Sequence, residues 1–271
     1  MSGLSFFIKF KKPFFFTALS PFTFHEKIFI QLVYNNYSDC VEQKYVFNFF
    51  IFFKKVIMNF IIVPFKNFKE AKSRIRRNLP DINTARIVKF MLEDVLYQVK
   101  KSKISDRNFI VTKDKEAIKL AERIGIDILL EKNQISESTS VDWASKQLVL
   151  LGGKNVLRIP SDIPLVKSED IDEIFDYALI NNSCVIVPSR SGTGTNAILR
   201  NPPNVIPSFF GSDSLKKHIE AFKKKNITCL VVKNTNIALD IDCTEDLAQL
   251  RFSKVKNQTT KYLFNSIYKN C

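Results

Sequence analysis

Histidine is almost absent from this sequence of 271 residues, which contains only His25 and His218. This scarcity argues strongly against a histidine-based metal cluster or a catalytic triad. The five cysteines are scattered, odd in number and without a C-x-x-C pair, at positions 40, 184, 229, 243 and 271. That pattern argues against a disulfide framework or a zinc site and favours a reducing compartment, so we expect a cytoplasmic protein.

Two further features are missing. A membrane-spanning helix takes about 18 uncharged apolar residues. In the first 57 residues the longest charge-free run lies between Lys12 and Glu26 and is interrupted by Pro13 and Pro21, so we expect no stable membrane insertion. The sequence also lacks the G-K-[ST] ending of a Walker loop, which disfavours ordinary kinase or ATPase chemistry.

Charge, in contrast, is abundant and one-sided, with a formal net value of +14. Such an excess is typical of proteins that bind polyanions. The lysines are spread along the chain rather than gathered in a run with interleaved aromatic residues, which disfavours nucleic acid as a partner. A solvated basic surface and a site for a triphosphate and a phosphorylated acid both remain compatible with this balance.

The composition changes sharply at Met58. Of the 25 phenylalanines, 14 lie in the first 57 residues and 11 in the remaining 214. The early segment is also rich in Lys, Asn, Ile and Tyr, which are encoded by A/T-heavy codons. We interpret residues 1–57 as a spurious or disordered N-terminal extension, in preference to a peripheral membrane segment or a targeting peptide.

From Met58 onward, strand patterns and helix patterns alternate. Short apolar runs predict buried strands at residues 59–64, 109–111, 127–130, 156–159 and 185–187. Apolar residues at helical spacing predict helices at residues 84–101, 116–124, 139–151 and 168–179, with Asn83 or Thr84 as the first cap and Gly125 ending the second helix. This alternation predicts an α/β fold in one domain, residues 58–252, with a mostly parallel central sheet and helices on both faces. Residues 253–271 are expected to form a C-terminal tail.

Ligands of such sheets bind beyond the carboxyl ends of the strands, so the loops after the predicted strands hold the candidate site. The loop after the first strand contains Lys66, Lys72 and Arg74. Their charges would suit a triphosphate and its leaving pyrophosphate. On this motif alone, a solvated basic loop is the simpler interpretation.

Three aspartates are candidate magnesium ligands. Asp162 follows an apolar strand and is held between two prolines, which suits a hard cation, although a turn or helix cap would also explain it. Asp240 and Asp242 alternate along a predicted strand at residues 237–242 and so share one face. Two buried like charges are unfavourable unless a cation lies between them. Thr244 is expected to cap a final helix.

Residues 189–197 read SRSGTGTNA and combine glycines with hydroxyl side chains. Their backbone amides and hydroxyls can surround a phosphate or a carboxylate. A plain glycine turn is the alternative interpretation.

In order along the chain, VPFKNFKEAKSRI, PSDIPLV, SRSGTGTNAILRNPP, FFGSDSLKKHIEAF and LDIDCTEDL together resemble the 2-phospho-L-lactate guanylyltransferase family. That family makes the guanylated precursor of coenzyme F420. The resemblance covers almost all of residues 58–247, and the glycine-containing and acidic motifs are specific in combination. It implies a nucleotidyltransferase domain of the GT-A, Rossmann-like type.

The resemblance also implies roles for individual residues. Magnesium would be held by Asp162, Asp240 and Asp242. The phosphorylated acid would be held by Thr195, Gly211 and Ser214, with Thr193 as a neighbouring candidate. The nucleotide would be held by Lys66, Lys72 and Arg74, and catalysis would fall to Asp162, Lys72 and Arg74. The expected substrates are GTP and a small phosphorylated hydroxy or enol acid, and the oligomeric state is left open, a homodimer included.

The sequence departs from the family in two places. Ser140-Val141-Asp142 stands where the family often has Gly-Leu-Asn, and Cys243 replaces a small or threonine-like residue. Two rival functions remain: another small-molecule nucleotidyltransferase of the same fold, and a basic nucleic-acid-binding module. The paired SGTGTNA and FGSDS motifs argue against the first rival, and the three isolated aspartates argue against the second.

The composition change at Met58 can be tested by truncation. A chain that begins at Met58 should fold and should match the full-length chain in activity, because the early segment carries none of the motifs above. Urea unfolding and pyrophosphate release, measured on both chains side by side, check this. Loss of folding or activity in the shorter chain alone would contradict the interpretation.

Overall fold

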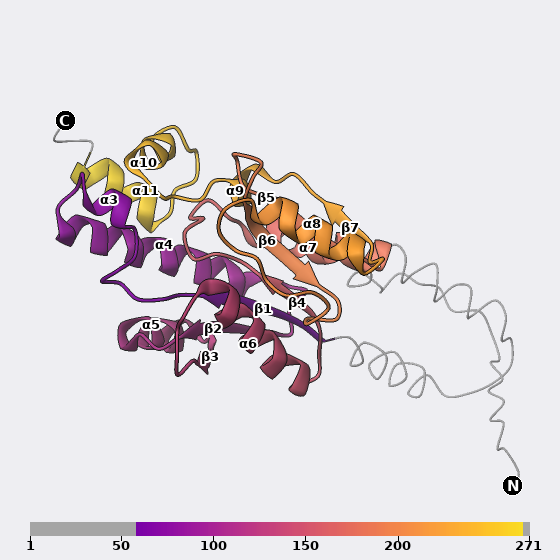
Figure 1. Ribbon diagram of the computed structural model, residues 1–271. Coiled ribbons are helices and arrows are strands. Elements are labelled where there is room, and N and C mark those ends of the chain that lie inside the picture. The colour runs from indigo at the N-terminus through magenta and orange to yellow at the C-terminus, as the bar shows by residue number, and fades with distance from the viewer. Residues whose placement is uncertain (1–57, 268–271) are drawn as a thin grey trace, which may run out of the picture. The chain divides into compact units, whose positions relative to one another are not determined.

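A seven-stranded sheet forms the centre of the structure, a computed structural model that describes residues 58–267 (Figure 1). The interpretation of residues 1–57 lies outside the described residues. The strands are β1 (Met58–Pro64), β2 (Arg107–Thr112), β3 (Asp127–Leu130), β4 (Gly153–Arg158), β5 (Cys184–Pro188), β6 (Thr195–Arg200) and β7 (Cys229–Val231). Their order in the sheet is β3-β2-β1-β4-β6-β5-β7.

The sheet is mostly parallel, as predicted, but β6 runs in the opposite direction. It pairs antiparallel with both of its neighbours, β4 and β5, whereas the other pairs are parallel. A reversed strand begins at the edge where its parallel neighbours end. Thr195, the first residue of β6, therefore lies at the carboxyl edge of the sheet, opposite Pro188 at the end of β5.

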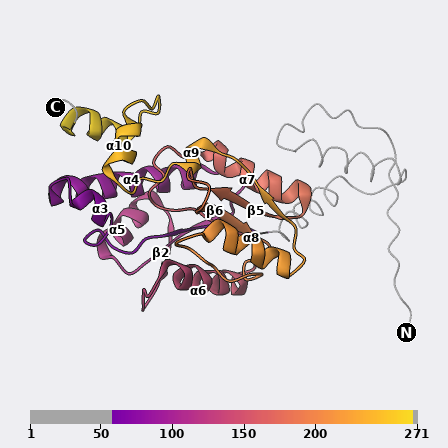
Figure 2. The same cartoon turned by 45° about the horizontal axis from the view of Figure 1, so that its top comes forward.

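Helices cover both faces of the sheet, which confirms the predicted fold class. They are α3 (Ser73–Arg76), α4 (Asp81–Lys101), α5 (Lys115–Ile124), α6 (Glu137–Leu150), α7 (Ser168–Asn181), α8 (Ser214–Lys224), α9 (Thr235–Ala238), α10 (Thr244–Leu250), α11 (Gln258–Tyr262) and the π-helix η1 (Leu263–Ile267). Figure 2 shows α4 and α7 on one side of the sheet and α6 on the other. None of the helices in residues 58–267 combines the length and apolar character needed to cross a bilayer.

Strand β1 shows why the run at residues 60–63 is apolar throughout. Ile61 and Val63 belong to the large core under α4, α5 and α7, whereas Phe60 and Ile62 belong to the core under α6. Both faces of the strand are buried, so every position of this run is apolar instead of every second one. This is the pattern from which the strand was predicted.

Three local predictions are wrong. Helix α4 begins after Pro80 rather than at Asn83 or Thr84, and the Thr84 hydroxyl donates back to the Pro80 carbonyl. Helix α10 is capped by Cys243, not Thr244, because the Asp246 carboxylate reaches back to the Cys243 backbone N–H.

The third concerns residues 237–242, which do not form a strand. Asn234 accepts hydrogen bonds from the backbone N–H groups of Asn236 and Ile237 and so starts the short helix α9. Such a cap competes with extended backbone. Asp240 and Asp242 therefore lie on irregular backbone between α9 and α10.

Residues 258–267, within the segment expected to be a C-terminal tail, pack against α4. The buried Asp94 carboxylate accepts hydrogen bonds from the backbone N–H groups of Gln258 and Thr259 at 3.0 and 2.9 Å, and from the Thr259 hydroxyl at 2.6 Å. Leu263 is buried in the large core. Figure 1 shows α11 beside α4 at the end of the molecule that also carries α3 and α10.

Candidate active site

Lys72 joins two carboxylates that are far from it in sequence. It follows β1 and takes a left-handed backbone conformation, φ 60°, immediately before α3. Its ammonium group contacts Asp162 Oδ2 and lies 2.5 Å from Asp242 Oδ1. Asp162 follows β4 and Asp242 precedes α10. The lysine and these two predicted metal ligands therefore meet at the carboxyl edge of the sheet.

Burial and neighbouring charges act on the pKa values of two groups in this cluster. Burial disfavours the charge of Lys72, but the carboxylates of Asp162 and Asp242 outweigh burial and raise its pKa, so the ammonium stays charged. Burial also raises the pKa of Asp240, whereas the hydrogen bond from the Asn196 amide lowers it. The charges of Asp162 and Asp242 raise this pKa further. Asp240 therefore lies within the electrostatic reach of the same cluster.

Hydrogen bonds hold the irregular segment around Asp240 in place. The backbone N–H of Ile241 donates to the Asp162 carbonyl at 3.0 Å, which ties the two acidic loops together. Asn196, on β6, donates from Nδ2 to the Ile237 carbonyl at 2.9 Å and to Asp240 Oδ1 at 3.0 Å. Because Asn196 is buried, this link positions Asp240 against the sheet. The sequence contained this residue in the SGTGTNA motif, but its role was not predicted.

Of the three predicted metal ligands, Asp162 and Asp242 meet, but at the Lys72 ammonium group. Asp162 Oδ1 is buried and has no hydrogen-bond partner, which is expensive unless a ligand satisfies it. Within residues 58–267, however, no three His, Cys, Asp or Glu side chains are grouped as a metal site. The Lys72 ammonium compensates Asp162 and Asp242 instead. A cation shared by these two residues and Asp240 therefore stays a prediction.

The predicted acid-binding loops come together beside this cluster. The backbone N–H of Thr195 donates to Ser214 Oγ at 2.8 Å, and the Thr193 carbonyl accepts from the N–H of Leu215 at 3.0 Å. Gly211 has φ 116°, a conformation that side chains disfavour, and its carbonyl accepts from the Ser214 N–H at 3.3 Å. These residues form one corner between the start of β6 and the start of α8.

Of the predicted basic loop, only Lys72 enters the acidic cluster. Lys66 is exposed and pairs with Glu70 at 2.8 Å. Arg74 is also exposed, on α3 two residues after Lys72. The three predicted cations are thus divided between one largely buried ammonium group and two exposed groups.

Two buried groups near the site were not predicted. His218 on α8 is fully buried. Arg158, at the end of β4, donates to the Asn196 carbonyl at 2.7 Å, pairs with Glu137 and lies 4.2 Å from the ring centroid of Phe210. A charged residue ending an apolar strand was a usable signal for Arg158. The role of His218 depends on contacts that its sequence position does not reveal.

Ser140 and Asp142, at which the sequence departs from the family, take part in a network of hydrogen bonds within the protein. Ser140 Oγ donates to Glu131 Oε2 at 2.7 Å. Asp142 accepts from the Ser208 hydroxyl at 2.7 Å and from Arg200 Nη1 at 3.2 Å. These contacts join α6 to the residue after β3, to the end of β6 and to the segment that follows β6.

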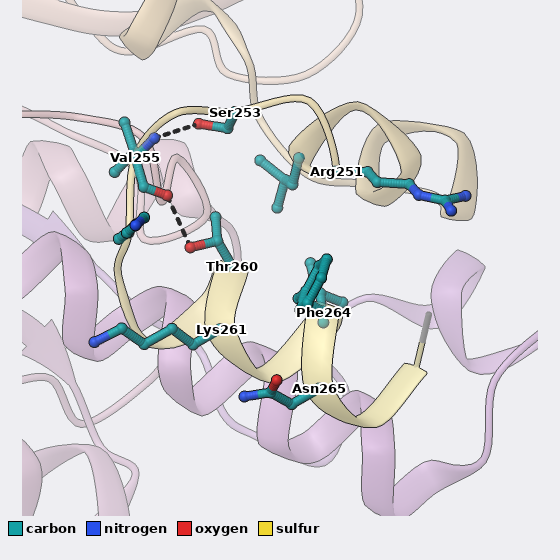
Figure 3. A pocket seen from close by; sticks show the side chains of 10 residues that line it. Arg251, Ser253, Val255, Thr260, Lys261, Phe264 and Asn265 are labelled. Atoms are coloured by element: carbon teal, nitrogen blue, oxygen red, sulfur yellow. Dashed lines mark hydrogen bonds between the residues drawn. The ribbon is translucent and has the colours of Figure 1, made fainter. Parts of the chain in front are cut away.

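A cavity of about 330 Å³ lies elsewhere, beside α10 and α11. Figure 3 shows the hydroxyls of Ser253 and Thr260 bonded to the backbone of Val255, and the side chains of Arg251 and Lys261 extending away from each other. Its lining contains none of the predicted site residues. The cluster around Lys72 is therefore the stronger candidate for the active site.

The mostly parallel sheet, with helices on both faces and acidic and basic groups at its carboxyl edge, defines the class of protein as α/β. Solved structures share the fold: a protein described as a nucleotide-diphospho-sugar transferase from Desulfovibrio desulfuricans has a TM-score of 0.65 at 15% identity, over 76% of this chain and 94% of its own. A cytidylyltransferase from Leptospira borgpetersenii has a TM-score of 0.52 at 15% identity, over 79% and 95%.

Sequence comparison then identifies the family. Residues 59–267 match the family described as "Guanylyl transferase CofC like", and the chain belongs to it. The 2-phospho-L-lactate guanylyltransferase of Methanobrevibacter smithii is 30% identical over 205 residues, 74% of this chain and 88% of its own. The phosphoenolpyruvate guanylyltransferase of Rubrobacter xylanophilus is 28% identical over 194 residues, 72% and 94%. The resemblance stated from the motifs is confirmed.

The hydrogen bonds by which Asn196 holds the segment around Asp240 can be tested by an isosteric substitution. Asn196→Asp replaces an amide donor with a carboxylate that faces the carbonyls of Ile237 and Ala238 and the carboxylate of Asp240. We expect a loss of at least about 3 kcal/mol in the free energy of unfolding. Urea denaturation measures it, with Asn204→Asp at an exposed position as the matched control. Equal stability of the two variants would contradict the role assigned to Asn196.

Proposed function

We propose that this guanylyltransferase transfers GMP from GTP to 2-phospho-L-lactate or phosphoenolpyruvate and releases pyrophosphate, in the biosynthesis of coenzyme F420. The observation that carries the proposal is the contact of Lys72 with Asp162 and Asp242, beside the corner formed by Thr195 and Ser214. The activities named for the relatives from M. smithii and R. xylanophilus support it.

The reaction is a substitution at the α-phosphorus of GTP. An oxygen of the acceptor's phosphate forms the new P–O bond, and the bond to the β-phosphate breaks, so that its electron pair leaves with pyrophosphate. The acceptor phosphate is already a nucleophile, so no histidine base is required. Positioning and charge stabilisation supply the rate. Lys72 carries the buried positive charge suited to the phosphates of the leaving group, and Lys66 and Arg74 would add exposed charge on the nucleotide side.

The acceptor acid is assigned to the corner between β6 and α8. Thr195, Gly211 and Ser214, with Thr193 beside them, offer short hydroxyls and backbone groups that suit a small anion. The Asn196 side chain, next to Thr195, bonds Asp240. The two subsites are thus adjacent along one strand, as the transfer of a group between two anions requires.

A divalent cation, expected to be Mg²⁺, would be held by Asp162, Asp240 and Asp242. The residues fit it in two respects: Asp162 Oδ1 is a buried oxygen without a partner, and all three donors are hard carboxylate oxygens. When bound, the cation would neutralise charge on the phosphates. The free thiols of Cys184, Cys229 and Cys243 accord with the proposed cytoplasmic location.

A substrate panel tests the proposal. With GTP, one of the two acids should yield pyrophosphate and the guanylated acid, and chelation of divalent cations should abolish the product. ATP, CTP and UTP should be used at least about tenfold less efficiently, since a site that bonds one base leaves groups unpaired with another. Pyrophosphate release and mass spectrometry of the product give the readout. Efficient transfer from CTP, or to sugar phosphates alone, would contradict the assignment.

A further inference from the structure

His218 is buried on α8 with both ring nitrogens occupied. Its Nδ1 lies 3.0 Å from Thr195 Oγ1, and its Nε2 accepts a hydrogen bond of 3.0 Å from the backbone N–H of Phe209. The rings of Phe209 and Phe210 pack edge-on against the imidazole, with centroids 5.6 and 5.3 Å away. These contacts hold the ring in one orientation.

The contact with Phe209 determines which nitrogen carries hydrogen. A backbone N–H can only donate, so Nε2 of His218 must be the unprotonated nitrogen, and in a neutral ring Nδ1 carries the hydrogen. Burial lowers the pKa of His218 to about 4, and the charges of Arg200 and Arg158 contribute in the same direction. At pH 7 the ring is neutral, and Nδ1–H donates to Thr195 Oγ1.

This bond decides what the Thr195 hydroxyl can do. A hydroxyl has one hydrogen to donate and two sites at which it accepts. With the opposite tautomer of His218, the threonine would spend its hydrogen on the ring. With Nδ1–H as the donor, the hydrogen of Thr195 is left for another acceptor. An anionic oxygen is the partner that gains most from such a donor.

We propose that His218 is a positioning residue that makes the Thr195 hydroxyl a hydrogen-bond donor to the phosphorylated acid. The inference rests on the proposed function, in which Thr195 holds that acid. His218 itself does not touch the acid. Its effect is transmitted through the Thr195 hydroxyl oxygen. A change at His218 should therefore alter KM for the acid more than KM for GTP.

Two amide substitutions separate the two sides of the ring. In His218→Asn the amide nitrogen lies near the position of Nδ1 and can still donate to Thr195. In His218→Gln the amide lies near Nε2 and retains a partner for Phe209 but not the donor to Thr195. We expect His218→Gln to raise KM for the acid about tenfold or more. This is the loss of affinity expected when one hydrogen bond to a charged group is removed. KM for GTP should change less than about twofold, and His218→Asn should restore KM for the acid to within about threefold of wild type.

A double-mutant cycle provides the control against a purely structural effect. In a Thr195→Val background, His218→Gln should raise KM for the acid no further than about twofold, because the hydroxyl that it orients is gone. Thermal unfolding of each variant establishes that it is folded. Equal effects of His218→Gln on both KM values, or the same loss with and without the Thr195 hydroxyl, would overturn the proposal.

The outcomes also separate this inference from the function on which it rests. If Thr195→Val transfers GMP with an unchanged KM for the acid, the positioning role is wrong and guanylyl transfer stands. If the wild-type protein transfers GMP to neither acid, the proposed function fails and takes the inference with it.

Discussion

The contact of one buried ammonium group with two carboxylates organises the site. Lys72, Asp162 and Asp242 come from three separate loops, and the lysine side chain is only 11% exposed. Without the ammonium, the two carboxylates would repel each other. Burial raises the pKa of Asp240, and the charges of Asp162 and Asp242 raise it further. Truncating one partner of such a cluster leaves charge uncompensated, which costs more than the contact itself is worth. The same cluster that stabilises the loops offers the charges that phosphoryl chemistry uses.

The reversed strand β6 connects this cluster to the corner proposed to bind the acid. In an all-parallel sheet, only residues that follow strands reach the carboxyl edge. Because β6 runs the other way, its first two residues lie there, with Thr195 bonded to Ser214 and Asn196 bonded to Asp240. Two neighbouring residues thus belong to the two proposed subsites, on opposite sides of the strand. A strand alternates its side chains, which is why adjacent positions can face different partners.

The elements predicted correctly from the sequence are those whose pattern of apolar residues is set by short stretches of the chain. Strand β1 and helix α5 were placed correctly, since an apolar run and a helical period with Gly125 at its end depend on few distant contacts. The strand at 237–242 was wrong because alternating aspartates resemble a strand, whereas the Asn234 cap stabilises a helical turn. The residue pattern of the loop did not distinguish Lys72 from Lys66, and only the resemblance gave Lys72 a catalytic role. Only the tertiary fold decides which lysine meets the distant carboxylates, and the same holds for His218 with Thr195.

The central claim is that the buried charge of Lys72 acts in guanylyl transfer, and a matched pair of lysine variants tests it most directly. Lys72→Met should lower kcat at least about a hundredfold, the scale for removing one preorganised charge-stabilising group. Lys69→Met, at an exposed position of the same loop, should stay within about twofold of wild type. Steady-state pyrophosphate release with both substrates saturating, on variants shown to be folded by circular dichroism, gives the comparison. A Lys72→Met enzyme with the kcat of the Lys69→Met enzyme would contradict the account.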